Sequence, residues 1–254
     1  MVSIKKAFLI SLLLTLLIFT LDSLSKSGFF VLQTKHFFIT KVIDGDTIEL
    51  SNGEIVRLLG INAPEINAPF GKDAKEFLSQ LVEGKDVYIE TDLSKRDNYG
   101  RILAFMFVGE KNINLEMVRN GFAHVFELEK ISKYVKELNE AELYAIKNQI
   151  GIWKRSNITC IKLLDLKVSG YEKVVLKNNC NFSVQIKDWI LEDANHNRFI
   201  FPSYLLKPNE IIEVYSTNKT AKFSFKNDFP IWNKEGDTLF LRDAHGLLVL
   251  FYRY

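Results

Sequence analysis

The sequence predicts an α+β domain followed by an all-β domain, and two patterns carry this prediction. Between residues 36 and 155, short β-branched and aromatic stretches alternate with stretches whose apolar residues have helical spacing. From residue 158 onward, almost every patterned stretch is a short strand candidate bounded by turn residues. The chain of 254 residues, 47% of them apolar, is long and apolar enough for two small domains.

The first 28 residues are predicted to be a signal peptide or a membrane anchor. Lys5 and Lys6 precede an apolar stretch, residues 7–21, that ends at Asp22. As a helix, these 15 residues reach roughly 22 Å, which is short of the roughly 30 Å hydrocarbon core of a membrane. A cleaved secretory signal is therefore favoured, with an uncleaved anchor as the alternative. Both interpretations place the rest of the protein outside the cytoplasmic membrane, where it would be either secreted or membrane-anchored.

Residues 36–156 are predicted to form five strands and three helices. The strand candidates, rich in β-branched and aromatic residues, are 36–43, 47–50, 54–60, 85–92 and 102–108. The helix candidates, each followed by a glycine, are 72–82, 115–120 and 132–149. Asn114 is expected to cap the second helix. Five strands, with a helix after the third and others at the end, suggest a small barrel of the oligonucleotide-binding (OB) type.

Three short segments of this domain place charged residues where a barrel needs only packing. They are Asp44-Gly45-Asp46-Thr47, residues 57–65 (RLLGINAPE) and residues 97–101 (DNYGR). Each alone is compatible with an ordinary turn or an edge strand. The oxygen donors that together suit a hard cation such as Ca²⁺ are Asp46, Glu65, the Asn62 amide and the Ala63 carbonyl. Two arginines, Arg57 and Arg101, supply donors for a phosphate, and phosphodiester hydrolysis needs this combination.

These three segments resemble the signature segments of the staphylococcal nuclease family. Residues 115–123 and Gly151-Ile152-Trp153 also match later helices of that family, so the resemblance extends over about residues 37–155. It implies an OB-fold barrel with three helices. It also implies a Ca²⁺-dependent phosphodiesterase, an endonuclease that hydrolyses DNA and RNA and leaves a 3′-phosphate and a 5′-hydroxyl.

The resemblance assigns a metal site to the first two segments. Asp46, Asn62 and the Ala63 carbonyl would bind Ca²⁺. Asp44 would orient the loop without binding the metal itself. One departure concerns this site, because the best-known member of the family carries an Asp where this chain has Asn62. A neutral ligand should weaken Ca²⁺ binding.

The resemblance also assigns the catalytic roles. Glu65 would be the general base that activates the attacking water. Arg57 and Arg101 would hold the scissile phosphate and stabilise its pentacoordinate state, and Tyr99 would touch a phosphate or sugar. An aromatic pair that stacks on the base in the best-known member is not evident here, although Phe126 is expected to substitute in part.

Residues 158–254 are predicted to form an all-β sandwich. The strand candidates are 161–168, 172–176, 189–191, 199–201, 211–215, 238–241 and 247–252. Residues 173–179, 188–193, 206–210 and 233–238 resemble a lamin-tail domain, an immunoglobulin-like sandwich. This resemblance implies a module that binds or positions an unidentified ligand: nucleic acid, another protein or the cell surface. Cys160 and Cys180 either pair in a disulfide or stay reduced. A zinc site is not expected, because His196 and His245 are not at ligand spacing to either cysteine.

The predicted function is thus an extracytoplasmic, Ca²⁺-dependent nuclease. Two alternatives remain: a catalytically silent OB-fold scaffold that binds nucleic acid or protein, and a cell-surface adhesion protein led by the sandwich. Intact Glu65, Arg57 and Arg101 argue against a silent domain. The net charge is +2 for the chain and −3 for residues 41–156, which hold 16 basic and 19 acidic residues. Phosphate must therefore be held locally, and we expect modest salt dependence.

Overall fold

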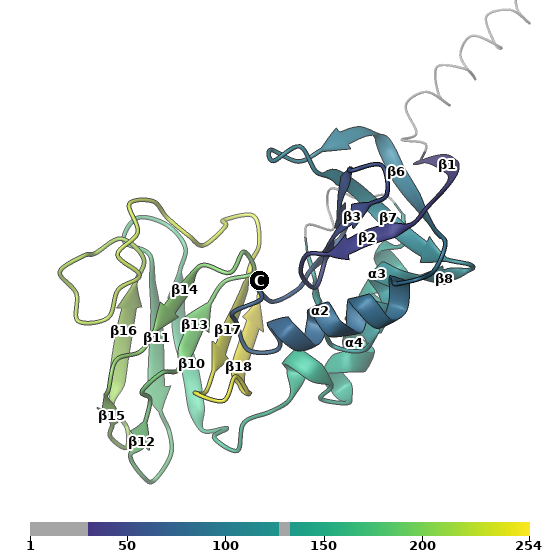
Figure 1. Ribbon diagram of the computed structural model, residues 1–254. Coiled ribbons are helices and arrows are strands. Elements are labelled where there is room, and N and C mark those ends of the chain that lie inside the picture. Colours follow the sequence, from purple (N-terminus) through teal and green to yellow (C-terminus); the bar gives the residue numbers. More distant parts are fainter. Residues whose placement is uncertain (1–29, 127–132) are drawn as a thin grey trace, which may run out of the picture.

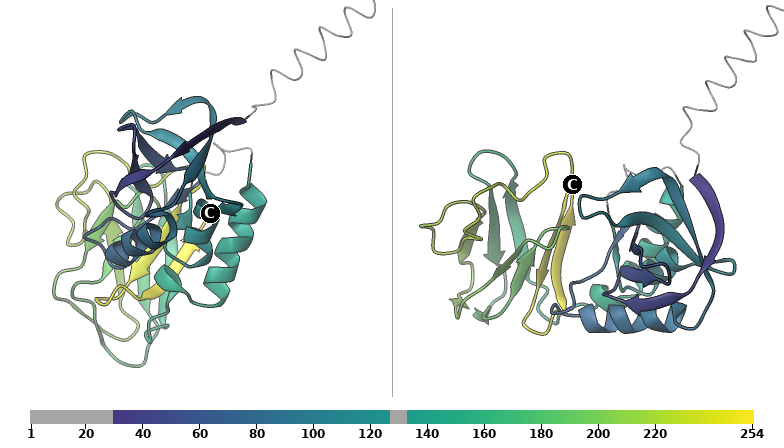
Figure 2. Two further views of the ribbon diagram at one scale, coloured as in Figure 1. Left: turned by 45° about the vertical axis from the view of Figure 1, so that its right-hand side comes forward. Right: turned by 45° about the horizontal axis from the view of Figure 1, so that its top comes forward.

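The computed structural model describes residues 30–126 and 133–254, with the backbone alone at residues 30–35 and 92–95 (Figure 1). Two β-rich halves lie side by side: an N-terminal half with helices and a C-terminal half made of strands (Figure 1). In the C-terminal half, strands β17 (Thr238–Arg242) and β18 (Leu248–Arg253) lie nearest to the N-terminal half (Figure 2).

The N-terminal half is built on one curved sheet. Its strands are β1 (Phe30–Phe37), β2 (Ile39–Val42), β3 (Thr47–Leu50), β4 (Ile55–Leu58), β6 (Val87–Arg96), β7 (Ile102–Val108) and β8 (Lys111–Asn112). Their spatial order is β1-β6-β7-β4-β3-β2, with β8 paired to β7. All neighbours are antiparallel except β4 and β7, which are parallel. A separate short pair joins β5 (Ile61–Asn62) to β9 (His124–Val125).

Three helices cover the core that this sheet encloses. They are α2 (Gly71–Val82), α3 (Ile113–Arg119) and α4 (Val135–Lys147), and a 3₁₀ turn, η2 (Gly151–Trp153), follows α4. Helix α2 buries Ala74, Leu78 and Val82, four residues apart, which is the spacing that places side chains on one helical face. The helices that the sequence predicts over residues 72–82, 115–120 and 132–149 are therefore present, with shifted ends.

The expected cap of the second helix is wrong by two residues. Asn112 is the N-cap of α3, and its side chain accepts a hydrogen bond from Leu115 N. Asn114 is instead fully buried, and its amide group bonds Met106 N and the carbonyl of Leu59. It therefore joins a helix to two strand segments, because a buried amide needs partners at both ends.

The C-terminal half consists of facing antiparallel sheets (Figure 1). One contains β10 (Ile161–Lys167), β11 (Lys173–Asn178) and β16 (Ile211–Tyr215); the other contains β14 (Arg198–Ile200), β13 (Ile190–Glu192), β17 and β18. A short pair, β12 (Val184–Gln185) with β15 (Leu205–Leu206), completes this half. Its core includes Trp189, Leu191 and Phe201. The immunoglobulin-like assignment and the lamin-tail resemblance stay predictions.

Cys160 and Cys180 form a disulfide, which resolves the alternative that the sequence left open. The bond joins the residue before β10 to the turn that follows β11, beside the core of the C-terminal half.

Buried contacts join the two halves. An apolar cluster contains Ile152 and Trp153 from the N-terminal half and Phe240 and Leu248 from the C-terminal half. The buried Arg242 guanidinium donates a hydrogen bond of 2.6 Å to the Ile152 carbonyl. Because each half has its own core, we propose the boundary between residues 156 and 158 as a domain boundary.

The predicted signal peptide or membrane anchor, residues 1–28, lies outside the described residues. Among the residues that the structure describes, no helix is long and apolar enough to cross a membrane. The described residues therefore give no support to the predicted membrane anchor or to the predicted extracytoplasmic location.

Candidate functional site

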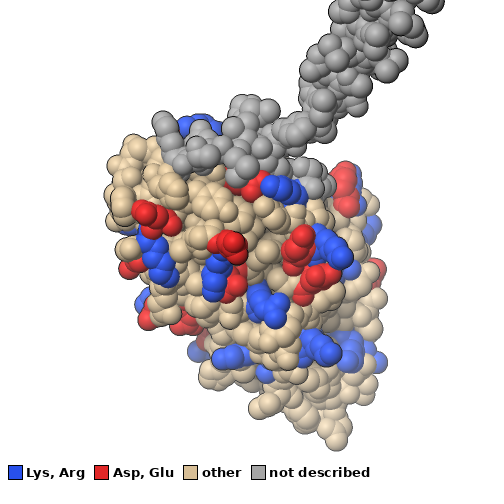
Figure 3. All heavy atoms as spheres, turned by 90° about the vertical axis from the view of Figure 1, so that its right-hand side faces the viewer, with Lys and Arg blue, Asp and Glu red and all other residues tan. Residues whose placement is uncertain are grey.

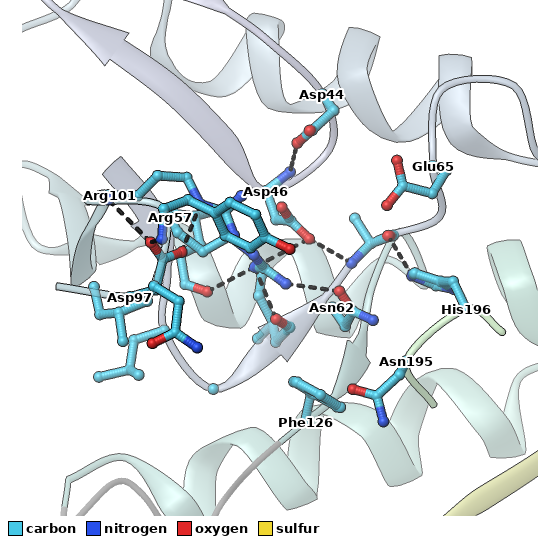
Figure 4. Close-up of a pocket in the computed structure, with 18 of the residues that line it drawn as sticks. Asp44, Asp46, Arg57, Asn62, Glu65, Asp97, Arg101, Phe126, Asn195 and His196 are labelled. Atoms are coloured by element: carbon cyan, nitrogen blue, oxygen red, sulfur yellow. Dashed lines mark hydrogen bonds and ion pairs between the residues drawn. The ribbon is translucent and has the colours of Figure 1, made fainter. Parts of the chain in front are cut away.

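A cleft of about 610 Å³ opens on the N-terminal half and extends to a turn of the C-terminal half (Figure 4). The site residues that the sequence predicts all line this cleft: Asp44, Asp46, Arg57, Asn62, Ala63, Glu65, Tyr99 and Arg101. They come from the turn between β2 and β3, from β4 and the segment after it, and from the turn between β6 and β7. The fold therefore brings together three segments that lie far apart in the sequence.

The turn between β2 and β3 directs Asp46 toward the end of β5. Asp44 Oδ1 accepts a hydrogen bond of 3.0 Å from Asp46 N, which closes the turn. Gly45 packs tightly, since a Cβ there would lie 2.7 Å from the Cβ atoms of Ala63 and Ala74. The Asp46 carboxylate is consequently almost buried, with 5% of the residue exposed.

Asp46, Arg57 and Asn62 form a bonded network on one side of the cleft. Asp46 Oδ2 accepts a hydrogen bond of 2.7 Å from Ala63 N and lies 3.0 Å from Arg57 Nη1. The same Nη1 donates to two backbone carbonyls, and Arg57 Nη2 donates to Asn62 Oδ1 at 2.6 Å. The guanidinium therefore fixes the strand end as well as offering positive charge to the cleft.

The donor set fits a hard cation in its chemistry. Burial is the main cause that raises the pKa of Asp44, and the negative charge of Asp46 is the second. A bound cation would reduce the repulsion between these two neighbouring carboxylates. The described residues contain no cluster of three or more His, Cys, Asp or Glu side chains arranged to hold a metal ion. Backbone and amide oxygens would have to complete the site, yet Asn62 Oδ1 is bonded to Arg57. A Ca²⁺ site therefore remains a proposal.

Glu65 differs from the bonded network in being exposed. It follows Pro64 just after β5, and its carboxylate is directed toward the Asp46 side of the cleft (Figure 4). Within the described part of the chain, this carboxylate has no hydrogen bond or ion pair. A free carboxylate in a cleft can accept a proton from water.

Arg101 and Tyr99 line the cleft from the turn between β6 and β7. Arg101 Nε donates a hydrogen bond of 2.6 Å to Asp97 Oδ2, and Nη1 lies 3.4 Å from Thr47 Oγ1. Burial alone would raise the pKa of Asp97, but hydrogen bonds from the Arg101 side chain and from the turn's backbone N–H groups lower it. The Tyr99 ring lies 5.4 Å from the Arg101 guanidinium, with 85% of the residue exposed.

Phe126 also lines the cleft and lies beside Asn195 (Figure 4), and its expected part in base stacking stays a prediction. Near it, His124 is buried at the junction of the two halves and packs against His196 and Phe240. Burial, and next the charge of His196, lower the pKa of His124 to about 3, so its imidazole is neutral.

Among the cleft residues that sequence reasoning missed are Asn195 and His196. Both come from the turn between β13 and β14 of the C-terminal half. His196 Nε2 donates a hydrogen bond of 2.9 Å to the Ala63 carbonyl. The only signal in the sequence is a polar run, Asp193-Ala194-Asn195-His196-Asn197, which reads as an ordinary turn.

Comparison with known proteins agrees with the geometry of the cleft. A family model described as staphylococcal nuclease homologue matches residues 55–155. The thermonuclease of Staphylococcus intermedius is 32% identical over 130 residues, which cover 48% of this chain and 77% of that protein. An uncharacterized protein of Methanocaldococcus jannaschii is 32% identical over 173 residues, covering 54% and 82%. Endonuclease YncB of Bacillus subtilis is 32% identical over 129 residues, covering 46% and 61%.

Proposed function

The chain belongs to the staphylococcal nuclease family, whose barrel is an OB-fold. From this premise we propose that it is a Ca²⁺-dependent nuclease that hydrolyses phosphodiester bonds of DNA and RNA. The observation that carries the proposal is the convergence of three charged segments on one cleft. The names of the relatives, thermonuclease and endonuclease, support a hydrolase that acts on nucleic acid.

The cofactor would be held by the bonded side of the cleft. Asp46 and the Ala63 carbonyl would provide oxygen ligands, Asn62 would be a further ligand, and Asp44 would support the loop through its bond to Asp46 N. Bound Ca²⁺ would neutralise charge on the phosphate and lower the pKa of a coordinated water. Asn62 would have to serve with the second lone pair of Oδ1, because Arg57 already donates to this atom.

The proton and the developing negative charge would be handled by three side chains. Glu65 would take the proton from the attacking water, because its carboxylate is exposed and unpaired among the described residues. Arg57 and Arg101 would stabilise the charge that builds up on the phosphate oxygens. Both guanidinium groups are held in place by carboxylates before substrate arrives, Arg57 by Asp46 and Arg101 by Asp97.

The surface charges favour substrate binding through a few local contacts rather than through net charge. In the part of one face that Figure 3 draws in colour, basic and acidic side chains are interspersed. With 16 basic and 19 acidic residues between positions 41 and 156, the domain does not attract a polyanion through its net charge. We therefore expect few phosphate contacts and a shallow dependence of binding on salt.

The purified full chain is expected to degrade DNA and RNA in the presence of Ca²⁺ and to stop when EGTA removes it. The Glu65→Gln variant should lower the rate by about 10²–10⁴-fold, since it removes the base and leaves the size of the side chain unchanged. Initial rates on a labelled oligonucleotide measure both effects.

The matched control is Glu76→Gln, which changes an exposed carboxylate on α2 outside the cleft and should leave the rate unaltered. An unchanged rate for Glu65→Gln would remove Glu65 from the mechanism. Binding of DNA without cleavage, with or without Ca²⁺, would instead favour the silent scaffold.

A further inference from the structure

The turn of residues 193–197 in the C-terminal half reaches into the cleft of the N-terminal half (Figure 4). It connects β13 to β14, and two of its residues, Asn195 and His196, line the cleft. The nuclease family model ends at residue 155, so this turn lies outside the matched region. It is therefore a feature of this chain's own second half.

Hydrogen bonds hold the turn in a defined shape. The fully buried Asp193 carboxylate accepts bonds from Asn195 N at 2.9 Å and from Asn197 N at 2.8 Å. Asn197 Nδ2 donates to the same carboxylate at 2.7 Å. Asp237, the residue before β17, accepts a further bond of 3.2 Å from Ala194 N through its Oδ1. A turn fixed in this way can orient a side chain, because its backbone has no need to rearrange.

Two bonds connect this turn to consecutive residues of the candidate metal site. His196 Nε2 donates to the Ala63 carbonyl at 2.9 Å, and Asn62 Nδ2 donates to the Ala194 carbonyl at 2.8 Å. Because a carbonyl can only accept, Nε2 carries the proton in the neutral imidazole. The Ala63 oxygen retains a second lone pair, so this bond leaves it able to bind a cation.

The same contacts account for an asparagine at position 62. Its Oδ1 accepts from Arg57 while its Nδ2 donates to the Ala194 carbonyl, so both ends of the amide are used. An aspartate has no donor and would place a carboxylate oxygen against that carbonyl. The amide thus links the arginine of the N-terminal half to the turn of the C-terminal half.

From this geometry we propose that His196 is a positioning residue of the nuclease site. It fixes the direction of the Ala63 carbonyl, and together with the Ala194 carbonyl it holds the Asn62–Ala63 segment that would bind the cation. The C-terminal half is then part of the working cleft rather than a separate module. This inference rests on the proposed Ca²⁺-dependent nuclease function.

The test compares substitutions at His196 in the full chain. His196 has a φ of 65°, in the left-handed region that asparagine tolerates well, so His196→Asn preserves the backbone. The amide nitrogen of this asparagine lies one bond closer to the backbone than the histidine Nε2 does, so it does not reach the Ala63 carbonyl. His196→Gln restores both the reach and an N–H donor. His245→Asn changes an exposed histidine of the same half and is the matched control.

Four quantities are measured for each protein: the Ca²⁺ dissociation constant by calorimetry without nucleic acid, kcat and KM on an oligonucleotide, and the melting temperature. His196→Asn should weaken Ca²⁺ binding and lower kcat by roughly tenfold or more, as losses of partners behind metal ligands do. His196→Gln should recover most of both, and His245→Asn should match the wild-type chain.

A lower melting temperature with unchanged Ca²⁺ affinity and kcat would reduce His196 to a structural contact and overturn the proposal. If His196→Asn does not fold, His196→Gly, which suits a positive φ, takes its place with the same expected losses. A wild-type chain that does not cleave with Ca²⁺ refutes the proposed function instead. A wild-type chain that cleaves, with a His196→Asn variant that equals it, refutes only the role of His196.

Discussion

The two arginines that the sequence assigns to the same task lie in different surroundings. The Arg57 side chain is 12% exposed, pairs with Asp46, and donates to Asn62 and to two backbone carbonyls. The Arg101 side chain is 28% exposed and is held mainly by Asp97, four residues before it. One guanidinium is thus part of the framework of the cleft, and the other lies at its open side. Equal charge does not imply equal dependence of the fold on each residue.

The largest effect is expected for Arg57→Ala, which tests the framework side. The substitution leaves Asp46 buried without its cation, and breaking a buried pair in this way typically costs about 3–5 kcal/mol of stability. The rate should also fall, by about 10²–10³-fold, because a donor to the phosphate is lost. Urea unfolding and initial rates measured on one preparation separate the two losses.

The control for this experiment is Arg57→Lys, which retains the charge but cannot bond Asp46, Asn62 and the carbonyls together. It should therefore fall between the wild-type chain and Arg57→Ala in stability. If Arg57→Ala unfolds at the wild-type urea concentration, the contrast between the two arginines is wrong.

Arg101→Ala should separate activity from stability. A fall in kcat of about 10²–10³-fold is expected for a lost charge donor to the transition state. Stability should change by less than about 1 kcal/mol, because a pair in contact with solvent contributes little. The matched control is Arg119→Ala, an exposed arginine on α3 outside the cleft that lies 4.3 Å from the Tyr144 ring; it should leave kcat unchanged and lower stability by at most about 1 kcal/mol. A stability loss equal to that of Arg57→Ala would show that Arg101 also belongs to the framework.

Local sequence patterns predicted two turns of the cleft well. The turn at Asp44 to Asp46 and the turn at residues 97–101 are fixed by hydrogen bonds between residues two to four positions apart. Chemistry of this range can be read from residue types alone. The family resemblance then placed the segments on one barrel, where they do line one cleft. Their individual roles stay predictions.

The turn of residues 193–197 was beyond such reasoning, because its function depends on how the two halves pack. Asn62 and Ala194 are 132 residues apart, and no local rule connects them. The sequence showed Asn62 only as a ligand weaker than Asp, whereas the structure gives it a second partner that requires an amide. The cap at Asn114 failed for a similar reason, since burial against β7 decided its partners.

The smallest effect is expected for Tyr99→Ala, which sharpens the description of the open side. Tyr99 is 85% exposed, and its ring lies 5.4 Å from the Arg101 guanidinium. An exposed contact of this kind is worth about 0.5–1 kcal/mol, so KM should rise by only a few-fold. The free energy of unfolding in urea should fall by no more than this amount, and Tyr99→Phe should retain the wild-type KM if the ring face is what matters. If Tyr99→Ala lowers kcat as far as Arg101→Ala does, the tyrosine and not Asp97 is what orients Arg101, and the open side of the cleft is held as firmly as the framework side.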